Sequence, residues 1–476
     1  MQVRMHPILH AVAWLSASFL VVGCSSSDSR AQAALGAYQS AAAQNDLFGA
    51  RRALLQLVKA KDDVSDYWVE LGKVQTAMGS YNDAYYAFTR AYELDRSNPD
   101  LIRALVQLAL RSGDISLAES HAQELEVLAP GDPWIKIVKG WSAFSDSHYD
   151  QSLAISNELL AQTPADPTAT VLKARSLIEL QREADAVDVL TKQVQNQPSD
   201  AGSLALLARI YEHQNDWRDV AQTAQRLVAL NPADQKDMVL LIKASFRSGD
   251  AAGGREASLK LLQPNADPET ISSVLDLWAD YWPSAQRAED ARQLAAAASG
   301  TQQRLIYAAF LSRIGSPADA IRIAGGMATL PVNAQNSEAN AVFADGLWRT
   351  GHGAAAKQRF DAVLAFDPGN ATALRGRSEL ELRMGNAKAA IFDAQKLTTV
   401  LPNSSRDRLL LADAYTAAGQ KDWADRTLWS AFQDIPADER IYAALRASRN
   451  GDADGLSEIQ EEFDRQRGAK LNRGLL

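Results

Sequence analysis

Prolines at a 34-residue spacing constrain this chain more than any other feature of its sequence. Seven of them share one phase of the period: Pro130, Pro164, Pro198, Pro232, Pro368, Pro402 and Pro436. A period of this length is typical of stacked helix-turn-helix units, each of which buries its apolar face against its neighbours. The same repeat unit is therefore expected to recur through nearly the whole protein.

The rest of the period indicates what each unit contains. With the proline at position 32, position 15 is glycine in Gly79, Gly113, Gly249, Gly351, Gly385 and Gly419. A helix often ends at a residue that tolerates a positive φ, and glycine does so without steric cost. Positions 8 and 20 are mostly small residues, which let two helix backbones approach closely. Each unit is therefore predicted to be two helices joined by a turn.

The unit that begins at 65 carries a fuller signature: Trp68, Leu71, Gly72, Ala84, Phe88 and Ala91. At this spacing it resembles the tetratricopeptide repeat, and the resemblance extends in phase from near Ala31 to Pro436. It implies an all-α solenoid of about 12 stacked units. Across 269–336 the pattern survives only as Gly315, Ala320 and Ala324, shifted by about two residues. We expect a distorted or hinge-like unit there.

The N-terminus carries a second pattern. Arg4 precedes an apolar run that ends at Val22 and is followed by Gly23 and Cys24. The run is shorter than the about 20 residues that a membrane-spanning helix needs. The segment resembles the signal of bacterial lipoproteins, which implies cleavage before Cys24 and lipidation of that residue. The alternative is an ordinary cleaved signal peptide with an incidental cysteine, but Cys24 is the only cysteine, and lipidation would explain an otherwise odd thiol in an exported protein.

These patterns divide the chain into six expected segments. They are a signal peptide at 1–23, a lipidated cysteine with a flexible tether at 24–30, an N-terminal array at 31–268, irregular repeats at 269–336, a C-terminal array at 337–438, and capping helices with a tail at 439–476. Ser25, rather than aspartate, follows the cysteine, and in similar Gram-negative lipoproteins this implies export to the outer membrane. The expected location is the outer membrane, facing the periplasm.

No motif for nucleotide binding, metal binding or nucleophilic catalysis is present in the sequence. The histidines His121, His148, His213 and His352 fall in different units, so they form no metal-ligand pair. We therefore expect no enzyme, no cofactor and no metal site. The net charge of −9 also argues against nucleic acid as a partner, since phosphate binding needs a basic surface.

The resemblance implies that positions 2, 5, 9, 12 and 13 of each unit line a concave groove where partners bind. Over 99–268 these positions hold seven basic residues and three acidic ones. The candidate groove residues are Arg103, Arg111, Trp134, Trp141, Phe144, Arg175, Arg209, Lys236, Lys243, Phe246 and Arg247. Exposed aromatic rings beside cations would suit an acidic protein segment or an acidic polysaccharide. The alternative is an ordinary solvated helix face, with Trp141 packed inside its own unit.

The expected function is a lipid-anchored periplasmic scaffold that mediates protein–protein interactions in an envelope assembly. Exopolysaccharide synthesis or export is favoured, because the array is longer than the few repeats typical of pilotin-like proteins. The alternative is an assembly factor for a pilus or a secretin-based secretion system. A third and remote possibility, from another class, is an enzyme with an unrecognised site in 269–336.

Overall fold

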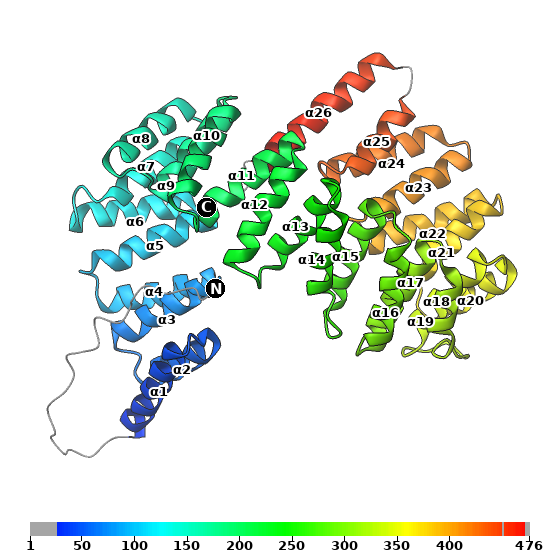
Figure 1. Ribbon diagram of the computed structural model, residues 1–476, viewed down its shortest axis with the longest axis horizontal. Helices are drawn as coiled ribbons and strands as arrows, with labels where there is room; N and C mark the ends of the chain where they lie inside the picture. The colour runs from blue at the N-terminus through cyan, green and yellow to red at the C-terminus, as the bar shows by residue number, and fades with distance from the viewer. Residues whose placement is uncertain (1–25, 450–451, 472–476) are drawn as a thin grey trace. The chain divides into compact units, whose positions relative to one another are not determined.

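The computed structural model describes residues 26–449 and 452–471 (Figure 1). Helices joined by short turns account for the regular structure of these residues, which confirms the predicted all-α solenoid. The described residues divide into two compact units, 26–159 and 160–471. Each unit is described by itself below.

The first unit holds four helix pairs, the last of which ends beyond the boundary. Its helices are α1 (Ser26–Ala43), α2 (Leu47–Ala60), α3 (Ser65–Ala77), α4 (Tyr81–Leu94), α5 (Pro99–Ser112), α6 (Ile115–Leu128), α7 (Pro133–Ser145) and α8 (Tyr149–Gln162). Helices α1 and α2, α3 and α4, and α5 and α6 pack as pairs, and each pair contacts the next.

The second unit continues the same plan from α9 to α26. Its first half contains α9 (Pro167–Glu179), α10 (Glu183–Asn196), α11 (Ala201–Gln214), α12 (Trp217–Leu230), α13 (Gln235–Arg247), α14 (Ala251–Leu261), α15 (Pro268–Tyr281), α16 (Gln286–Ala297) and α17 (Thr301–Arg313). Its second half contains α18 (Pro317–Gly325), α19 (Ser337–Arg349), α20 (Gly353–Phe366), α21 (Ala371–Arg383), α22 (Ala387–Val400), α23 (Ser405–Ala417), α24 (Lys421–Asp434), α25 (Glu439–Ser448) and α26 (Ala453–Leu471).

Acidic or amide side chains at position 34 start many of the odd-numbered helices. Asp132 Oδ1 accepts a hydrogen bond from the Trp134 amide at 2.9 Å, and Asp166 Oδ1 accepts one from the Ala169 amide at 2.8 Å. Such caps satisfy amides that have no partner inside the helix, and they contribute about 1 kcal/mol each. The proline at position 32 lies just before this cap, where it cannot extend the preceding helix.

Outside the stretch 269–336, the turn inside the repeats has one backbone conformation, whichever residue occupies it. The six glycines at position 15 have φ between 75° and 91°, as predicted. Asn45, Ser147, Gln181 and Asn215 occupy the same position in other repeats, and their φ lies between 55° and 61°. The helix pair of the repeat therefore imposes this conformation, and glycine is the residue that adopts it most easily.

The expected tether at 24–30 is wrong for the residues that the structure describes. Helix α1 begins at Ser26, so 26–30 are helical. Asp28 lies in the first turn, where a negative charge favours the helix dipole, and it forms an ion pair of 2.8 Å with Lys61. The serine-rich composition suggested a linker because serine is a poor helix former in isolation, but packing of α1 against α2 outweighs this preference.

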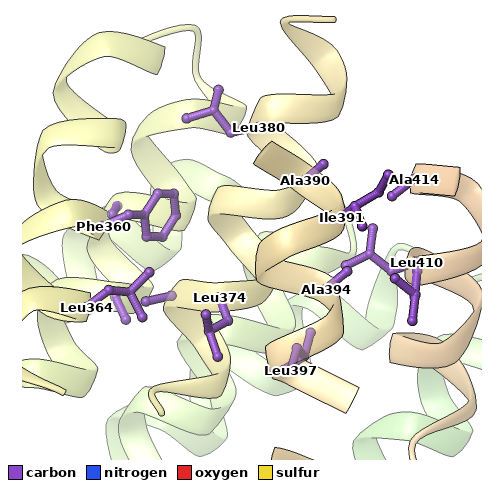
Figure 2. Close-up of a cluster of buried hydrophobic side chains, with 14 of the residues drawn as sticks. Phe360, Leu364, Leu374, Leu380, Ala390, Ile391, Ala394, Leu397, Leu410 and Ala414 are labelled. Atoms are coloured by element: carbon purple, nitrogen blue, oxygen red, sulfur yellow. The ribbon is translucent and has the colours of Figure 1, made fainter. Parts of the chain in front are cut away.

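The signature residues meet in the core of each repeat. A Cβ atom on Gly72 would lie 2.7 Å from Phe88 Cε2, so the absence of a side chain at position 8 makes room for the aromatic ring at position 24. In the second unit, Phe360, Leu374, Ala390 and Leu397 belong to a buried cluster that runs across successive helices (Figure 2). The core is thus built from contacts between neighbouring repeats, as in other solenoids.

The stretch 269–336 lies inside the second unit as two helix pairs, and its irregularity has a local cause. Position 15 of the repeat that begins at 269 is Pro283, which cannot adopt a positive φ. The positive φ of the next repeat falls on Gly315, two residues early, as the shifted pattern predicted. Helix α18 has only nine residues. The stretch is therefore distorted as expected.

We predict that this stretch opens first when the second unit fluctuates. Amides in 269–336 should exchange with solvent faster than those in 167–234, because short helices with altered turns make weaker contacts with their neighbours. Hydrogen exchange measured by mass spectrometry on the full chain would test this. Equal protection of the two stretches would contradict it.

Candidate partner-binding surface

The odd-numbered helices of successive repeats lie side by side and form the inner layer of each unit. In the second unit α9 lies against α11, and each odd-numbered helix from α13 to α25 lies against the next one. The predicted groove positions lie on these helices. We call their face the inner face.

On the inner face of the first unit, one of the two predicted cations already has carboxylate partners. The Arg103 guanidinium donates to Asp132 at 2.6 Å and also pairs with Asp100. Arg111 is exposed, and its guanidinium carbon lies 4.2 Å from the centre of the Tyr81 ring. Arg111 is thus the more accessible of these two cations.

The aromatic residues predicted for this face are mostly not available to a partner. Trp141 is fully buried and packs edge-on against Phe144, with ring centres 5.7 Å apart. Phe144 and Trp134 are half-buried. The expectation of an exposed Trp141 is therefore wrong, because the large ring is covered by its own repeat, which was the alternative left open by the sequence. Burying such a ring stabilises the fold by about 2 kcal/mol.

In the second unit, Arg175 and Phe246 are also buried rather than exposed. Burial and, to a smaller extent, the charge of Arg209 together lower the pKa of the Arg175 guanidinium to about 10. Phe246 stacks on Trp282 with ring centres 5.5 Å apart, so it belongs to the core around α15. Arg209 and Lys236 are exposed.

Arg247 lies in a cage made by its own chain. Its guanidinium carbon lies 4.1 Å from the Trp217 ring centre and 5.3 Å from that of Tyr281. Its Nη1 donates to both carboxylate oxygens of Glu439, at 2.7 and 2.8 Å. Stacking on aromatic faces and a charged hydrogen bond both stabilise a cation. Lys243 beside it is paired with Glu212 at 2.8 Å.

These contacts close the inner layer of the second unit on itself. Glu439 follows Arg247 by 192 residues, and Arg440 pairs with Asp280, 160 residues before it, at 3.3 Å. Helix α26 packs against α11, where the Arg467 guanidinium donates to the carbonyl oxygen of His213. Figure 1 shows α26 beside α11. The C-terminal helices thus occupy the part of the predicted partner surface that surrounds Arg247.

We predict that reversing either charge in the Arg247–Glu439 pair loosens α25 and α26. Arg247→Glu and Glu439→Arg each place like charges together, and each should weaken the contact by about 1 to 2 kcal/mol, since the pair is partly exposed. The amides of α26 should then exchange several-fold faster. The double variant Arg247→Glu with Glu439→Arg should recover part of the protection, because it restores the ion pair but not the stacking of Arg247 on Trp217 and Tyr281. No recovery at all would show that the charges do not hold the contact.

The predicted signal peptide and Cys24, the predicted lipidation site, lie outside the described residues. Within 26–449 and 452–471, no helix combines the length and apolar character needed to cross a membrane. No group of three or more His, Cys, Asp or Glu side chains in that part of the chain could hold a metal ion.

Family models of tetratricopeptide repeats match two parts of the chain. The model of the Psidin N-terminal repeat region matches residues 136–270, and a general tetratricopeptide repeat model matches residues 342–399. No curated protein matches the sequence. The matched parts lie in the repeats that the proline period defines.

Solved structures of similar fold include proteins of several kinds. One is PilW, described as a widely conserved type IV pilus biogenesis factor, which is 17% identical over 41% of this chain and 91% of its own, with a TM-score of 0.32. PilF of Pseudomonas aeruginosa is 14% identical over 42% of this chain and 91% of its own, with a TM-score of 0.30. Cut9–Hcn1 of the APC/C is 13% identical over 94% of this chain and 97% of its own, with a TM-score of 0.31. Likenesses at these scores say nothing about what the chain binds.

The repeat period, the conformation of the turns and both family models agree with one another, and the chain is a tetratricopeptide-repeat protein.

Proposed function

We propose that this protein is a lipid-anchored scaffold of the periplasm that recruits protein partners into an envelope assembly, with exopolysaccharide synthesis or export as the favoured process. The observation that carries the proposal is the extent of the array, since repeat helices fill the described chain from Ser26 to Leu471. Such arrays provide long surfaces for partners. The proposal includes no catalytic activity, and it treats the two helix pairs of 269–336 as part of the scaffold.

The anchor is proposed from the sequence and from where the first helix begins. Helix α1 starts two residues after Cys24. A lipid on Cys24 would therefore hold the first unit within several ångströms of the membrane, since a residue spans at most about 3.6 Å of extended chain. Several acyl chains on one residue suffice for stable anchoring. The proposed membrane is the outer one, because Ser25 follows the cysteine.

The surface of the second unit adds a condition to partner binding. An acidic protein segment or an acidic polysaccharide that reaches Arg247 must compete with Glu439. Such a ligand should bind more tightly to Glu439→Gln than to the unchanged chain, and its binding should weaken as salt is added.

Metabolic labelling tests the anchor. Radiolabelled palmitate should enter the unchanged chain in cells that express it, and it should not enter Cys24→Ala. Equal labelling of the two chains, or labelling of neither, would refute the lipid anchor.

Chemical crosslinking in intact cells, followed by purification of the protein and mass spectrometry of its neighbours, tests the scaffold role. Components of a polysaccharide synthase or export machine should be recovered. Recovery of a secretin, a pilin or another secretion-channel protein would instead favour the alternative role in pilus or secretion-system assembly. Recovery of no envelope protein would contradict both.

A further inference from the structure

A cleft of about 460 Å³ opens in the first unit among α6, α7 and α8. Its wall combines apolar side chains, Ala122 from α6, Ile135 and Val138 from α7 and Ile155 from α8, with a larger number of polar ones. The residues of α7 that line it stand at positions 3 and 6, whereas the inner face uses positions 2 and 5. The cleft therefore lies on a different face from the partner surface discussed above.

One feature of the sequence contributes to the cleft. Ala122 occupies position 24, where Phe88 and Phe360 fill the space between helices in two other repeats. A phenylalanine side chain buries far more area than alanine, and protein interiors leave few voids larger than a water molecule. Ala224 and Ala394 stand at the same position, so the small residue adds room to the cleft but does not account for it alone.

Carboxylates dominate the rim of the cleft. Glu119, Glu126 and Asp146 line it, together with one lysine, Lys139. Lys139 Nζ lies 3.7 Å from Glu126, and the Ser142 hydroxyl donates to Glu119. Three carboxylates against one ammonium leave an excess of two negative charges around a hollow that is only partly apolar. Asp146 and Glu126 are exposed, so both can meet a ligand.

We propose that this cleft binds a segment of a partner protein that offers one or two apolar side chains flanked by lysine or arginine. The hollow is within the size range of clefts that bind ligands, and burial of apolar side chains supplies affinity. The acidic rim selects basic neighbours and repels acidic ones. The inference rests on the proposed scaffold function, and it names the chemistry of one partner segment.

A synthetic peptide tests the assignment on the full chain. The probe is fluorescein-labelled Lys-Lys-Leu-Leu-Lys-Lys, with Lys-Lys-Ala-Ala-Lys-Lys and Glu-Glu-Leu-Leu-Glu-Glu as comparisons, and binding is read by fluorescence anisotropy. The leucine–lysine peptide should bind at least tenfold more tightly than either comparison. Equal binding of the three peptides, or no binding at millimolar concentration, would overturn the proposal.

Two kinds of variant locate the binding. Ala122→Phe fills the cleft and should weaken binding at least tenfold. Glu126→Lys with Asp146→Lys changes only exposed side chains, so it should leave the helical fold intact while removing the preference for lysine. Glu93→Lys, an exposed carboxylate on α4 outside the cleft, is the matched control and should bind as the unchanged chain does. If the rim variant binds like the control, the cleft is not the site.

The outcomes for this cleft and for the scaffold role are separable. Failure of the peptide to bind, with envelope partners still recovered by crosslinking in cells, overturns the cleft alone. Peptide binding without any envelope partner supports the cleft and contradicts the scaffold role.

Discussion

Phe360→Ala is expected to lower the free energy of unfolding of the repeats around α20 by about 3 to 5 kcal/mol, which is the usual cost of removing a large buried ring. The Phe360 side chain has no exposed surface and lies in the cluster shown in Figure 2. Its ring rests directly on the backbone of the next repeat, where a Cβ on Gly376 would lie 2.5 Å from Phe360 Cζ. Alanine would leave a cavity between two rigid helices, which cannot easily collapse to fill it.

The loss should remain local, because the stability of a solenoid is nearly a sum over neighbouring repeats. Hydrogen exchange should accelerate in α19–α22 and change little in α9–α12. Phe392→Ala is the matched control, since that ring on α22 is 65% exposed and its removal should cost less than about 0.5 kcal/mol. Similar exchange in the two variants would contradict the assigned packing.

The repeat plan and its turns were predictable because they depend on local chemistry. Position 15 needs a positive φ, so glycine gathers there and marks the end of the first helix. The exceptions Gln181 and Ser147 show that the helix pair dictates the conformation even where the residue does not favour it. The departure at Pro283 was also visible, since proline cannot take that conformation.

The closure of the second unit was not predictable from the sequence. Arg247 and Glu439 lie 192 residues apart in the sequence, and whether they meet depends on small rotations added over all the repeats between them. The repeat pattern places Arg247 on the inner face but does not predict which residues of the C-terminal repeats contact it. The aromatic cage of Trp217 and Tyr281 around it carried no separate sequence signal.

The sequence also predicted the wrong exposure for large side chains on the inner face. A repeat position fixes the direction of the Cα–Cβ bond, while a ring such as that of Trp141 can turn back and pack over its own helix. Burial of so much apolar area outweighs exposure to solvent. Charged residues at the same positions keep their heads near water or pair with a carboxylate, as Arg103 does with Asp132.

Asp407→Ala is expected to lower the free energy of unfolding by about 3 kcal/mol, at the low end of the cost of breaking a buried ion pair. Asp407 is fully buried, and its two oxygens accept hydrogen bonds from Arg375 Nε and Nη2 at 2.6 and 2.8 Å. This pair joins α21 to α23. Burial alone would lower the pKa of Arg375, but the hydrogen bonds and charge of Asp407, together with the charges of Glu379 and Glu338, outweigh it and raise that pKa, so the guanidinium stays charged. In Asp407→Ala the charged Arg375 guanidinium remains buried, and only the charges of Glu379 and Glu338 nearby stabilise it.

Two further variants distinguish the loss of the Arg375–Asp407 ion pair from the cost of leaving the Arg375 charge buried without that partner. Asp434→Ala removes a carboxylate that is about half exposed and pairs with Arg408 at 3.0 Å, and it should cost less than about 1 kcal/mol. Replacing both members, Arg375→Met with Asp407→Leu, should recover much of the loss, because no unpaired charge stays buried. Unfolding in urea and hydrogen exchange across α21–α24 would measure all three. If Asp407→Ala proved as mild as Asp434→Ala, then Arg375 must reach solvent or another carboxylate, and the pair would not be what joins these two helices.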